Sequence, residues 1–141
     1  MKCDIYPLNS LKEYRYVVIF SFYKGKLLFS RHKQRITWET QGGHIEPGET
    51  PHMAASRELQ EESGAEKYTL TPLFDYFAGY ENSNANGMVF AAHIEKLGPL
   101  PESEMAETAL FESLPEQLTY PGITPVLYRY YLQEQEMAAK A

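Results

Sequence analysis

The residues best suited to chemistry lie in one segment, Gly43 to Ala65, which reads GHIEPGETPHMAASRELQEESGA. This segment predicts a helix over residues 51–63. Thr50 is a good N-cap and Pro51 suits the first helical position. Gly64 suits the left-handed residue that ends many helices. The segment therefore carries a loop, a helix start and a helix stop of its own.

Three glutamates share one face of this predicted helix. At about 100° per residue, Glu58, Glu61 and Glu62 fall within an arc of roughly 100°. Their charges repel one another, and two of them lie in the last turn, where the helix dipole disfavours negative charge. Taken alone, such a cluster could be a solvated acidic face. A divalent cation would neutralise it, and ligands that are all oxygen favour Mg²⁺ or Mn²⁺.

The wider spacing resembles the Nudix box, G-x5-E-x7-R-E-U-x-E-E-x-G-U, in which U is a bulky apolar residue. The matching residues are Gly43, Glu49, Arg57, Glu58, Leu59, Glu61, Glu62 and Gly64. The chain departs from the family pattern at two places. Ala65 is smaller than the usual Ile, Val or Leu, and Thr40-Gln41 precedes the glycine pair where Phe-Pro is more usual. We expect the loss of that proline to loosen the entry to the loop.

The resemblance implies a hydrolase that uses divalent metal to cleave a diphosphate linked to another group. The catalytic residues that it implies are Glu58, Arg57, Glu61, Glu62 and Glu49, and the implied metal ligands are Glu58, Glu61, Glu62 and the Gly43 carbonyl. Glu58 is the candidate general base, or the residue that orients the attacking water. Arg57 is expected to hold the glutamates by ion pairing. The resemblance leaves open whether Glu49 supports the loop or binds a second ion, and which glutamate binds which ion.

Many family members recruit one more acid from a loop beyond the central strands. The segment PESEMAETALFESLPEQLTYP offers Glu102, Glu104 and Glu107 for this role. Counting back from the apolar pair Leu110-Phe111 selects Glu104 as a further metal ligand and leaves Glu107 as the second candidate. A solvated acidic loop is the alternative.

A short basic cluster precedes the glycine loop. Arg31, Lys33 and Arg35, with His32 between them, are the only concentrated positive charge before the box. Such a cluster suits contacts with substrate phosphates, so these three cations are predicted substrate-binding residues. A polar turn without a substrate contact is the alternative.

Composition limits the classes of partner. The 141 residues suit a single domain over residues 1–141. The net charge of −6 argues against nonspecific binding to nucleic acid or to an anionic membrane. The sequence contains no apolar run long enough to span a bilayer and no evident signal peptide. Cys3 is the one cysteine, so we expect a cytoplasmic protein without an internal disulfide.

Strand and helix signals alternate along the chain. Strands are predicted at 14–22, 26–30, 68–80, 88–94 and 109–112, a hairpin turn at Asn86-Gly87, a helical turn at 115–118 and a terminal helix at 125–137. This order suits an α/β fold of α+β character with a mixed sheet between helices. The resemblance implies the same architecture, a Nudix-type α/β/α sandwich with a mixed central sheet.

The expected function is therefore a Mg²⁺- or Mn²⁺-dependent pyrophosphohydrolase of small nucleotide-type substrates. The compact length and the segment LFESLPEQL resemble the small Nudix enzymes that convert nucleoside triphosphates, in some branches oxidised ones, to monophosphate and pyrophosphate. Nucleotide sugars, dinucleoside polyphosphates and capped RNA ends are the alternative substrates. A noncatalytic nucleotide-binding module is disfavoured because every box carboxylate is present. The monomeric or dimeric state is left open.

Overall fold

The computed structural model describes residues 2–80 and 83–140. In these residues the chain forms eight strands and two helices. They are β1 (Lys2–Tyr6), β2 (Tyr14–Tyr23), β3 (Lys26–His32), β4 (Trp38–Glu39), β5 (Gln41–His44), α1 (Pro51–Ser63), β6 (Ala65–Tyr80), β7 (Ser83–Leu97), β8 (Met105–Phe111) and α2 (Thr124–Lys140). Neither helix is both long enough and apolar enough to cross a membrane.

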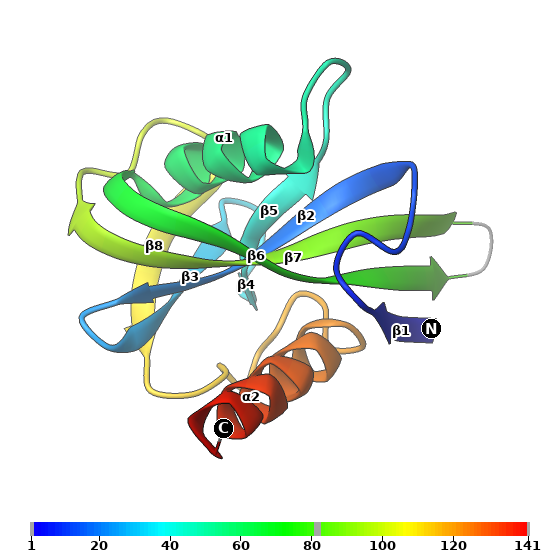
Figure 1. Cartoon of the computed structure of the whole chain (residues 1–141). Coiled ribbons are helices and arrows are strands. Elements are labelled where there is room, and N and C mark those ends of the chain that lie inside the picture. The colour runs from blue at the N-terminus through cyan, green and yellow to red at the C-terminus, as the bar shows by residue number, and fades with distance from the viewer. Residues whose placement is uncertain (1, 81–82, 141) are drawn as a thin grey trace.

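The strands form one mixed sheet between two helices. The main strand order is β1-β6-β7-β2-β3-β4, with β5 paired to β2 and β8 paired to β3. The β2–β7 pair is parallel, whereas the pairs β1–β6, β6–β7, β2–β3 and β2–β5 are antiparallel. Helix α1 covers one face of the sheet and α2 the other (Figure 1). The predicted fold class, an α/β/α sandwich of α+β character with a mixed sheet, is confirmed.

Each helix closes a separate apolar layer. On one face, Ala54, Ala55 and Leu59 of α1 are fully buried in a cluster that includes Val17 and Ile19 of β2. The two alanines let the helix backbone approach the sheet closely. On the other face, Leu127 and Tyr131 of α2 pack in a cluster that includes Phe20 and Phe74. Strand β2 is therefore covered on both sides, which fixes the position of α1 relative to the central strands.

Helix α1 begins and ends at the predicted residues. The Thr50 hydroxyl accepts a hydrogen bond from the Met53 N–H at 3.1 Å, and Pro51 occupies the first turn. Gly64 adopts φ +82° and its N–H donates to the Gln60 carbonyl at 3.1 Å. A Cβ at Gly64 would also lie only 2.5 Å from the Pro99 carbonyl oxygen. Both the conformation and the packing at this stop require glycine.

The predicted turn at Asn86-Gly87 is wrong. Both residues lie inside β7, where Asn86 pairs with Phe77 and Gly87 with Tyr76. A Cβ at Gly87 would lie 2.3 Å from the Tyr76 ring, so this glycine provides room for a cross-strand tyrosine rather than a turn. Strand β7 also pairs with β2 over this region, and that long-range pairing overrides the local turn signal. Residues 81–82, between β6 and β7 in the sequence, lie outside the described residues.

Other boundaries also differ from the sequence-based prediction. Segment 115–118 is not helical; Leu118 instead forms an isolated bridge to Trp38. Strand β8 begins at Met105, before the predicted start at residue 109, because it pairs along β3 as far as His32. Strands β1, β4 and β5 were not predicted. Their short sequences carry little signal alone, and each is stabilised by an antiparallel neighbour.

Candidate functional site

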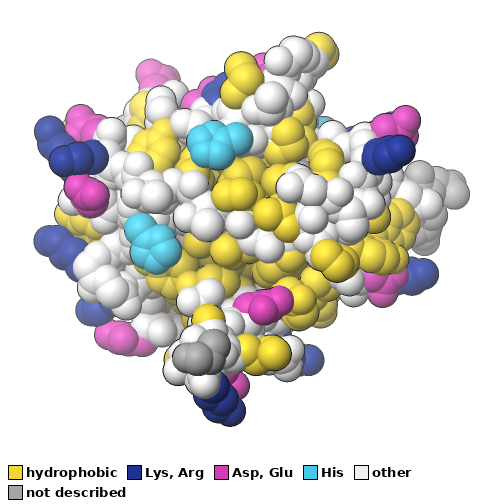
Figure 2. All heavy atoms as spheres, viewed as in Figure 1, with side chains coloured by type: hydrophobic (Ala, Val, Ile, Leu, Met, Phe, Trp, Pro, Cys, Tyr) yellow, Lys and Arg dark blue, Asp and Glu magenta, His cyan; other side chains and the backbone are white. Residues whose placement is uncertain are grey.

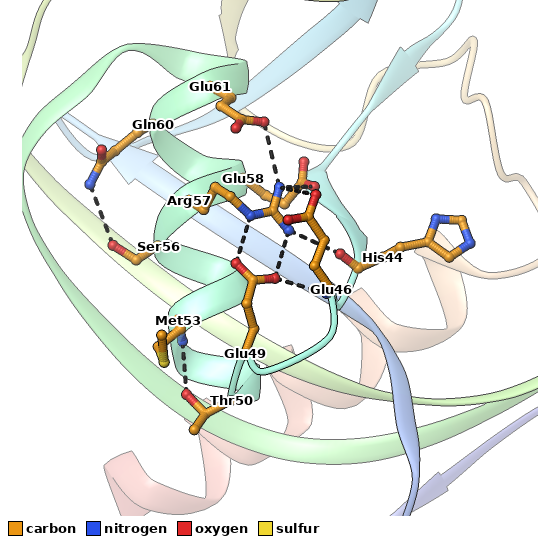
Figure 3. A network of polar contacts seen from close by, with 10 residues as sticks. All are labelled: His44, Glu46, Glu49, Thr50, Met53, Ser56, Arg57, Glu58, Gln60 and Glu61. Atoms are coloured by element: carbon orange, nitrogen blue, oxygen red, sulfur yellow. Dashed lines mark hydrogen bonds and ion pairs between the residues drawn. The ribbon is translucent and has the colours of Figure 1, made fainter.

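Arg57 lies at the centre of the acidic residues on α1 and the preceding loop (Figure 3). Its Nε and Nη2 donate to the two oxygens of Glu49 at 2.7 and 2.9 Å, which is a bidentate pair. Its Nη1 donates to Glu58 Oε1 at 2.8 Å, and Nη2 also donates to the His44 carbonyl at 3.1 Å. The Arg57 guanidinium thus links Glu58 of the helix to Glu49 and His44, which precede the helix. Ion pairs with the glutamates are the contacts predicted for Arg57.

Glu49 contributes to loop geometry. Its Oε1 accepts the Glu46 N–H at 2.8 Å in addition to the contact with Arg57. The hydrogen bond from Arg57, followed by a backbone hydrogen bond at Glu46, lowers the pKa of Glu49 to about 2. The hydrogen bond to Glu49 likewise raises the pKa of Arg57. Both groups are therefore charged across the whole neutral range, and of the two predicted roles this geometry supports the loop-supporting one.

Gly43 lies against the Glu58 carboxylate. A Cβ at Gly43 would be 2.8 Å from Glu58 Oε1, so a larger residue would displace this carboxylate from its contact with Arg57. Burial raises the pKa of Glu58, although Arg57 opposes the change. The Gly43 backbone and the Glu58 carboxylate are thus neighbours, as the predicted ligand set requires.

Glu62 points into the protein from the last turn of α1. Its Oε1 accepts the Gly42 N–H at 2.8 Å, and the residue is only 9% exposed. Burial raises its pKa to about 9, and the nearby carboxylates of Glu58, Glu39 and Glu104 contribute to the rise, against the hydrogen bond from Gly42. Burial and the neighbouring carboxylates therefore disfavour the charged form of Glu62, and a divalent cation at this position would offset that cost.

Glu61 is the most exposed of the three helix glutamates. Its side chain is 54% exposed, and its Oε2 lies 3.6 Å from Arg57 Nη1. Across residues 2–80 and 83–140, no three His, Cys, Asp or Glu side chains stand close enough together to hold a metal ion as they are. The reason is visible in the contacts, because Arg57 holds Glu58 and the Gly42 N–H holds Glu62. The oxygen-only donors and the buried carboxyl of Glu62 nevertheless fit Mg²⁺ or Mn²⁺.

The three candidate acids of the later loop differ in their surroundings. Glu104 lies near enough to Glu62 to raise its pKa, and its Oε2 is 3.8 Å from His32 Nε2. Glu107 instead pairs with Arg31 at 2.8 Å. Glu102 is exposed, and no ion pair to it is found in the described part of the chain. Among the three, Glu104 has the environment that the predicted metal ligand needs.

The predicted basic cluster is largely occupied by other contacts. Arg31 pairs with Glu107 and also donates to the Arg35 carbonyl at 2.9 Å. Arg35 Nη1 donates to Glu39 Oε1 at 3.0 Å. Among the described residues, Lys33 is the one of these three cations without an acidic partner, and its side chain is exposed. Ion pairs thus offset the charges of Arg31 and Arg35, whereas the described residues offer none to Lys33.

The expectation of a loose entry to the glycine loop is wrong. Gln41 is fully buried in β5, and its Nε2 donates to the Leu28 carbonyl and to Ser30 Oγ at 3.1 and 2.9 Å. Its Oε1 accepts the Ser21 hydroxyl at 2.6 Å. Three hydrogen bonds therefore tie this segment to β2 and β3, where a proline side chain could form none. Ala65 is 4% exposed and belongs to the core cluster beside α1, so its small size suits the packing.

A pocket of about 410 Å³ opens on the other side of the glycine pair. Its lining includes Gly42 and Gly43, residues of β2, β6 and β7, and the segment that leads into α2. Glu39 also lines it, although no motif in the sequence marked this residue. Glu39 lies in the two-residue strand β4, which was not predicted, so its burial could not be inferred from the sequence. The pocket is of a size that holds small organic ligands.

A comparison with known families identifies the class. Residues 13–130 match the family model of the NUDIX domain. That match covers more than half of the chain, so the protein belongs to the Nudix family. Members of this hydrolase family act on phosphoric anhydride bonds of small nucleotide substrates and generally use divalent metals.

Individual relatives support the same class. The chain is 36% identical over 109 residues to YtkD of Bacillus subtilis (strain 168), whose proposed activity is that of an 8-oxo-dGTP diphosphatase. The match covers 74% of this chain and 66% of the relative, slightly under two thirds of the relative's length. The fold is similar to that of a mutant of the Bacillus subtilis pyrophosphohydrolase BsRppH, with a TM-score of 0.80, 24% identity and coverage of 94% of this chain and 90% of that one. A UDP-X diphosphatase has a TM-score of 0.71 at 19% identity, covering 89% of this chain and 66% of that one.

Proposed function

We propose that this protein, as a single Nudix domain over residues 1–141, is a Mg²⁺- or Mn²⁺-dependent pyrophosphohydrolase. Its substrate is a nucleoside triphosphate, oxidised bases included, which it converts to monophosphate and pyrophosphate. The observation that carries the proposal is the buried carboxylate of Glu62, which adjoins Glu58 and Glu104 beside the Gly42 backbone. The single cysteine, Cys3, suits a reducing cytoplasm, where we place the enzyme.

Each residue of the candidate site has its own role in the proposed reaction. The ion would be held by Glu58, Glu61, Glu62, Glu104 and the Gly43 carbonyl. When bound, it would neutralise phosphate charge and lower the pKa of a bound water. Glu58 accepts the proton of the attacking water, and Arg57 fixes the orientation of Glu58 through Oε1. Glu49 keeps Arg57 and the loop in place. Lys33 attracts the polyphosphate.

The size of the pocket and its position beside the glycine pair favour a substrate with one compact organic group beyond the phosphates. The activity proposed for the relative YtkD, that of an 8-oxo-dGTP diphosphatase, favours a nucleoside triphosphate. The structures with a similar fold include a UDP-X diphosphatase and the pyrophosphohydrolase BsRppH. Nucleotide sugars, dinucleoside polyphosphates and capped RNA ends therefore stay in the test as alternative substrates.

A substrate panel tests the proposal. Purified protein is incubated with nucleoside triphosphates, oxidised triphosphates, nucleotide sugars, dinucleoside polyphosphates and capped RNA, each with Mg²⁺, with Mn²⁺ and with chelator. We expect pyrophosphate release from triphosphates with either metal and none with chelator. Release from another class alone would reassign the substrate, and turnover that persists in chelator would overturn the metal-dependent mechanism.

A further inference from the structure

The pocket beside the glycine pair is lined by aromatic rings and by one buried acid. Its lining includes four residues with rings, Tyr16, His44, Tyr76 and Tyr120. The ring centroids of Tyr16 and His44 are 4.5 Å apart. Aromatic walls suit a flat ring system. Apolar side chains gather across the middle of the face between α1 and α2, and charged side chains lie mostly toward its margins (Figure 2). Within the pocket, Glu39 is the one acidic lining residue in the described part of the chain.

Glu39 is held by one of its two oxygens. The residue is 8% exposed, and its Oε1 accepts hydrogen bonds from Arg35 Nη1 at 3.0 Å and from Thr119 Oγ1 at 3.1 Å. The Thr119 hydroxyl is itself 2.8 Å from Thr37 Oγ1. Glu39 Oε1 is thus held by donors from two segments, one four residues and the other 80 residues away in the sequence.

The second oxygen of Glu39 is available to a ligand. Within residues 2–80 and 83–140, no hydrogen-bond donor lies on Glu39 Oε2. The same described residues contain one fully enclosed side-chain oxygen or nitrogen without a partner, and that atom is Asp75 Oδ1. Glu39 Oε2 is therefore not sealed inside the protein. A carboxylate oxygen accepts hydrogen bonds only, so an occupant of the pocket gains from presenting N–H donors to it.

We propose that Glu39 is a specificity-determining residue that selects a guanine-type base. This inference rests on the proposed function, since it names the base of the proposed nucleotide substrate. The N1–H and the 2-amino group of guanine are adjacent donors, and both can donate to Glu39 Oε2, which has two lone pairs. Adenine places an acceptor nitrogen beside its amino group, and the uracil ring flanks its one donor with carbonyl oxygens. Each of these would place a lone pair against the carboxylate. The repulsion would lower the affinity for adenine or uracil relative to guanine.

The competing role for Glu39 is that of a metal ligand. Its carboxylate is close enough to Glu62 to affect that residue's charge. However, the Arg35 guanidinium at 3.0 Å already supplies positive charge to Glu39 Oε1, which weakens the attraction of a cation to this carboxylate. The two roles differ in their consequences. A base selector distinguishes guanine from adenine, whereas a metal ligand affects every nucleotide alike.

Equilibrium binding separates these roles without requiring catalysis. The affinities of guanosine, inosine and adenosine 5′-monophosphates are measured by calorimetry in chelator, for the wild type and for Glu39→Gln. The amide keeps an oxygen for Arg35 and Thr119, but it can present an N–H donor to the pocket. Glu112→Gln is the matched control, because Glu112 is an exposed acid paired with Lys26 outside the pocket.

We expect the wild type to bind guanosine monophosphate most tightly, inosine monophosphate less and adenosine monophosphate least. Glu39→Gln should weaken guanosine monophosphate binding about 10-fold or more, as the loss of hydrogen bonds to a base edge usually does, and leave adenosine monophosphate binding equal or tighter. Glu112→Gln should bind all three as the wild type does. If Glu39→Gln does not fold, Thr119→Val removes one anchor of Oε1 and should weaken guanosine monophosphate binding selectively, by a smaller factor.

Three results would overturn the inference: equal affinity for the three bases, an equal loss for all three in Glu39→Gln, or no binding of any of them. Selective binding without hydrolysis in the substrate panel would instead contradict the proposed function and leave the base preference standing. Hydrolysis of triphosphates without base selectivity would contradict this inference alone.

Discussion

Glu58 gives the most direct test of the chemistry at the level of single residues. Glu58→Gln keeps the shape and the hydrogen bond from Arg57 but removes the charge and the proton acceptor. We predict that kcat falls on the order of 10²-fold or more, as is typical when a base or metal-positioned water is lost. Steady-state kinetics with Mg²⁺ measures the change, with circular dichroism as the check on folding. Unchanged turnover would remove Glu58 from the mechanism.

Arg57 is predicted to act through geometry rather than charge. Lysine keeps the positive charge but cannot bridge both oxygens of Glu49 and also reach Glu58, as the guanidinium does. We expect Arg57→Lys to lower kcat clearly while the metal concentration needed for half-maximal activity changes less. A fully active Arg57→Lys enzyme would show that the bidentate contact has no catalytic value.

Glu104 tests the acid contributed from outside the box. Its side chain is 83% exposed, so its removal should cost little stability. It is nevertheless close enough to Glu62 to raise the pKa of that residue, as an acid near a shared metal ion would be. We predict that Glu104→Gln lowers kcat about 10-fold or more without loss of stability, whereas Glu102→Gln leaves kcat unchanged. Thermal unfolding and kinetics on the two variants, together with Glu107→Gln, provide the comparison. An effect confined to Glu107→Gln would move the role to that residue.

At the scale of elements, the stop of α1 fixes the carboxylates at the end of the helix. Gly64→Ala would combine a strained backbone at φ +82° with a Cβ 2.5 Å from the Pro99 carbonyl oxygen. Gly25→Ala is a matched control, since Gly25 has a similar φ of +78° but nothing within 4 Å of its Cβ position. We predict a loss of about 1 kcal/mol for Gly25→Ala and about 2 kcal/mol or more for Gly64→Ala. Urea unfolding measures both, and equal losses would show that the contact with Pro99 is harmless.

Elements with local signals were predictable, and elements held by distant partners were not. Helix α1 has its cap, its first proline and its stop within its own sequence, so its limits were predicted correctly. The Asn86-Gly87 signal failed because β7 is paired on both sides by strands far away in sequence. The same limit applies to the site. Residues of the box are adjacent in sequence, but the burial of Glu39 depends on Arg35 and on Thr119, and no local pattern shows the latter contact.

At the scale of the whole molecule, the sheet separates two tasks. The α1 face carries the carboxylates around Arg57, and the pocket for the organic group lies toward the start of α2. The Gly42-Gly43 backbone lies between them, with the Gly42 N–H bound to Glu62 and both glycines in the pocket lining. Under the proposed function, a substrate that fills the pocket would be brought beside the carboxylates by the same two residues, which would couple recognition of the organic group to cleavage.

The charge of Glu62 should make the stability of the whole metal-free protein depend on pH. Its pKa is raised from an ordinary value of 4.5 to about 9, chiefly by burial. Between these values the folded protein keeps a proton that the unfolded chain releases, so stability is complete below the lower pKa and falls as pH rises toward the higher one.

Glu62→Gln keeps an oxygen for the Gly42 N–H and removes the titration. In chelator, we predict that the free energy of unfolding of the wild type falls relative to Glu62→Gln between about pH 5.5 and about pH 8.5. Added Mg²⁺ should reverse the fall in the wild type only, because the ion binds the charged form in the folded state. Urea unfolding at the two pH values, with chelator and with Mg²⁺, measures both effects, and parallel pH profiles for the two proteins would contradict the raised pKa.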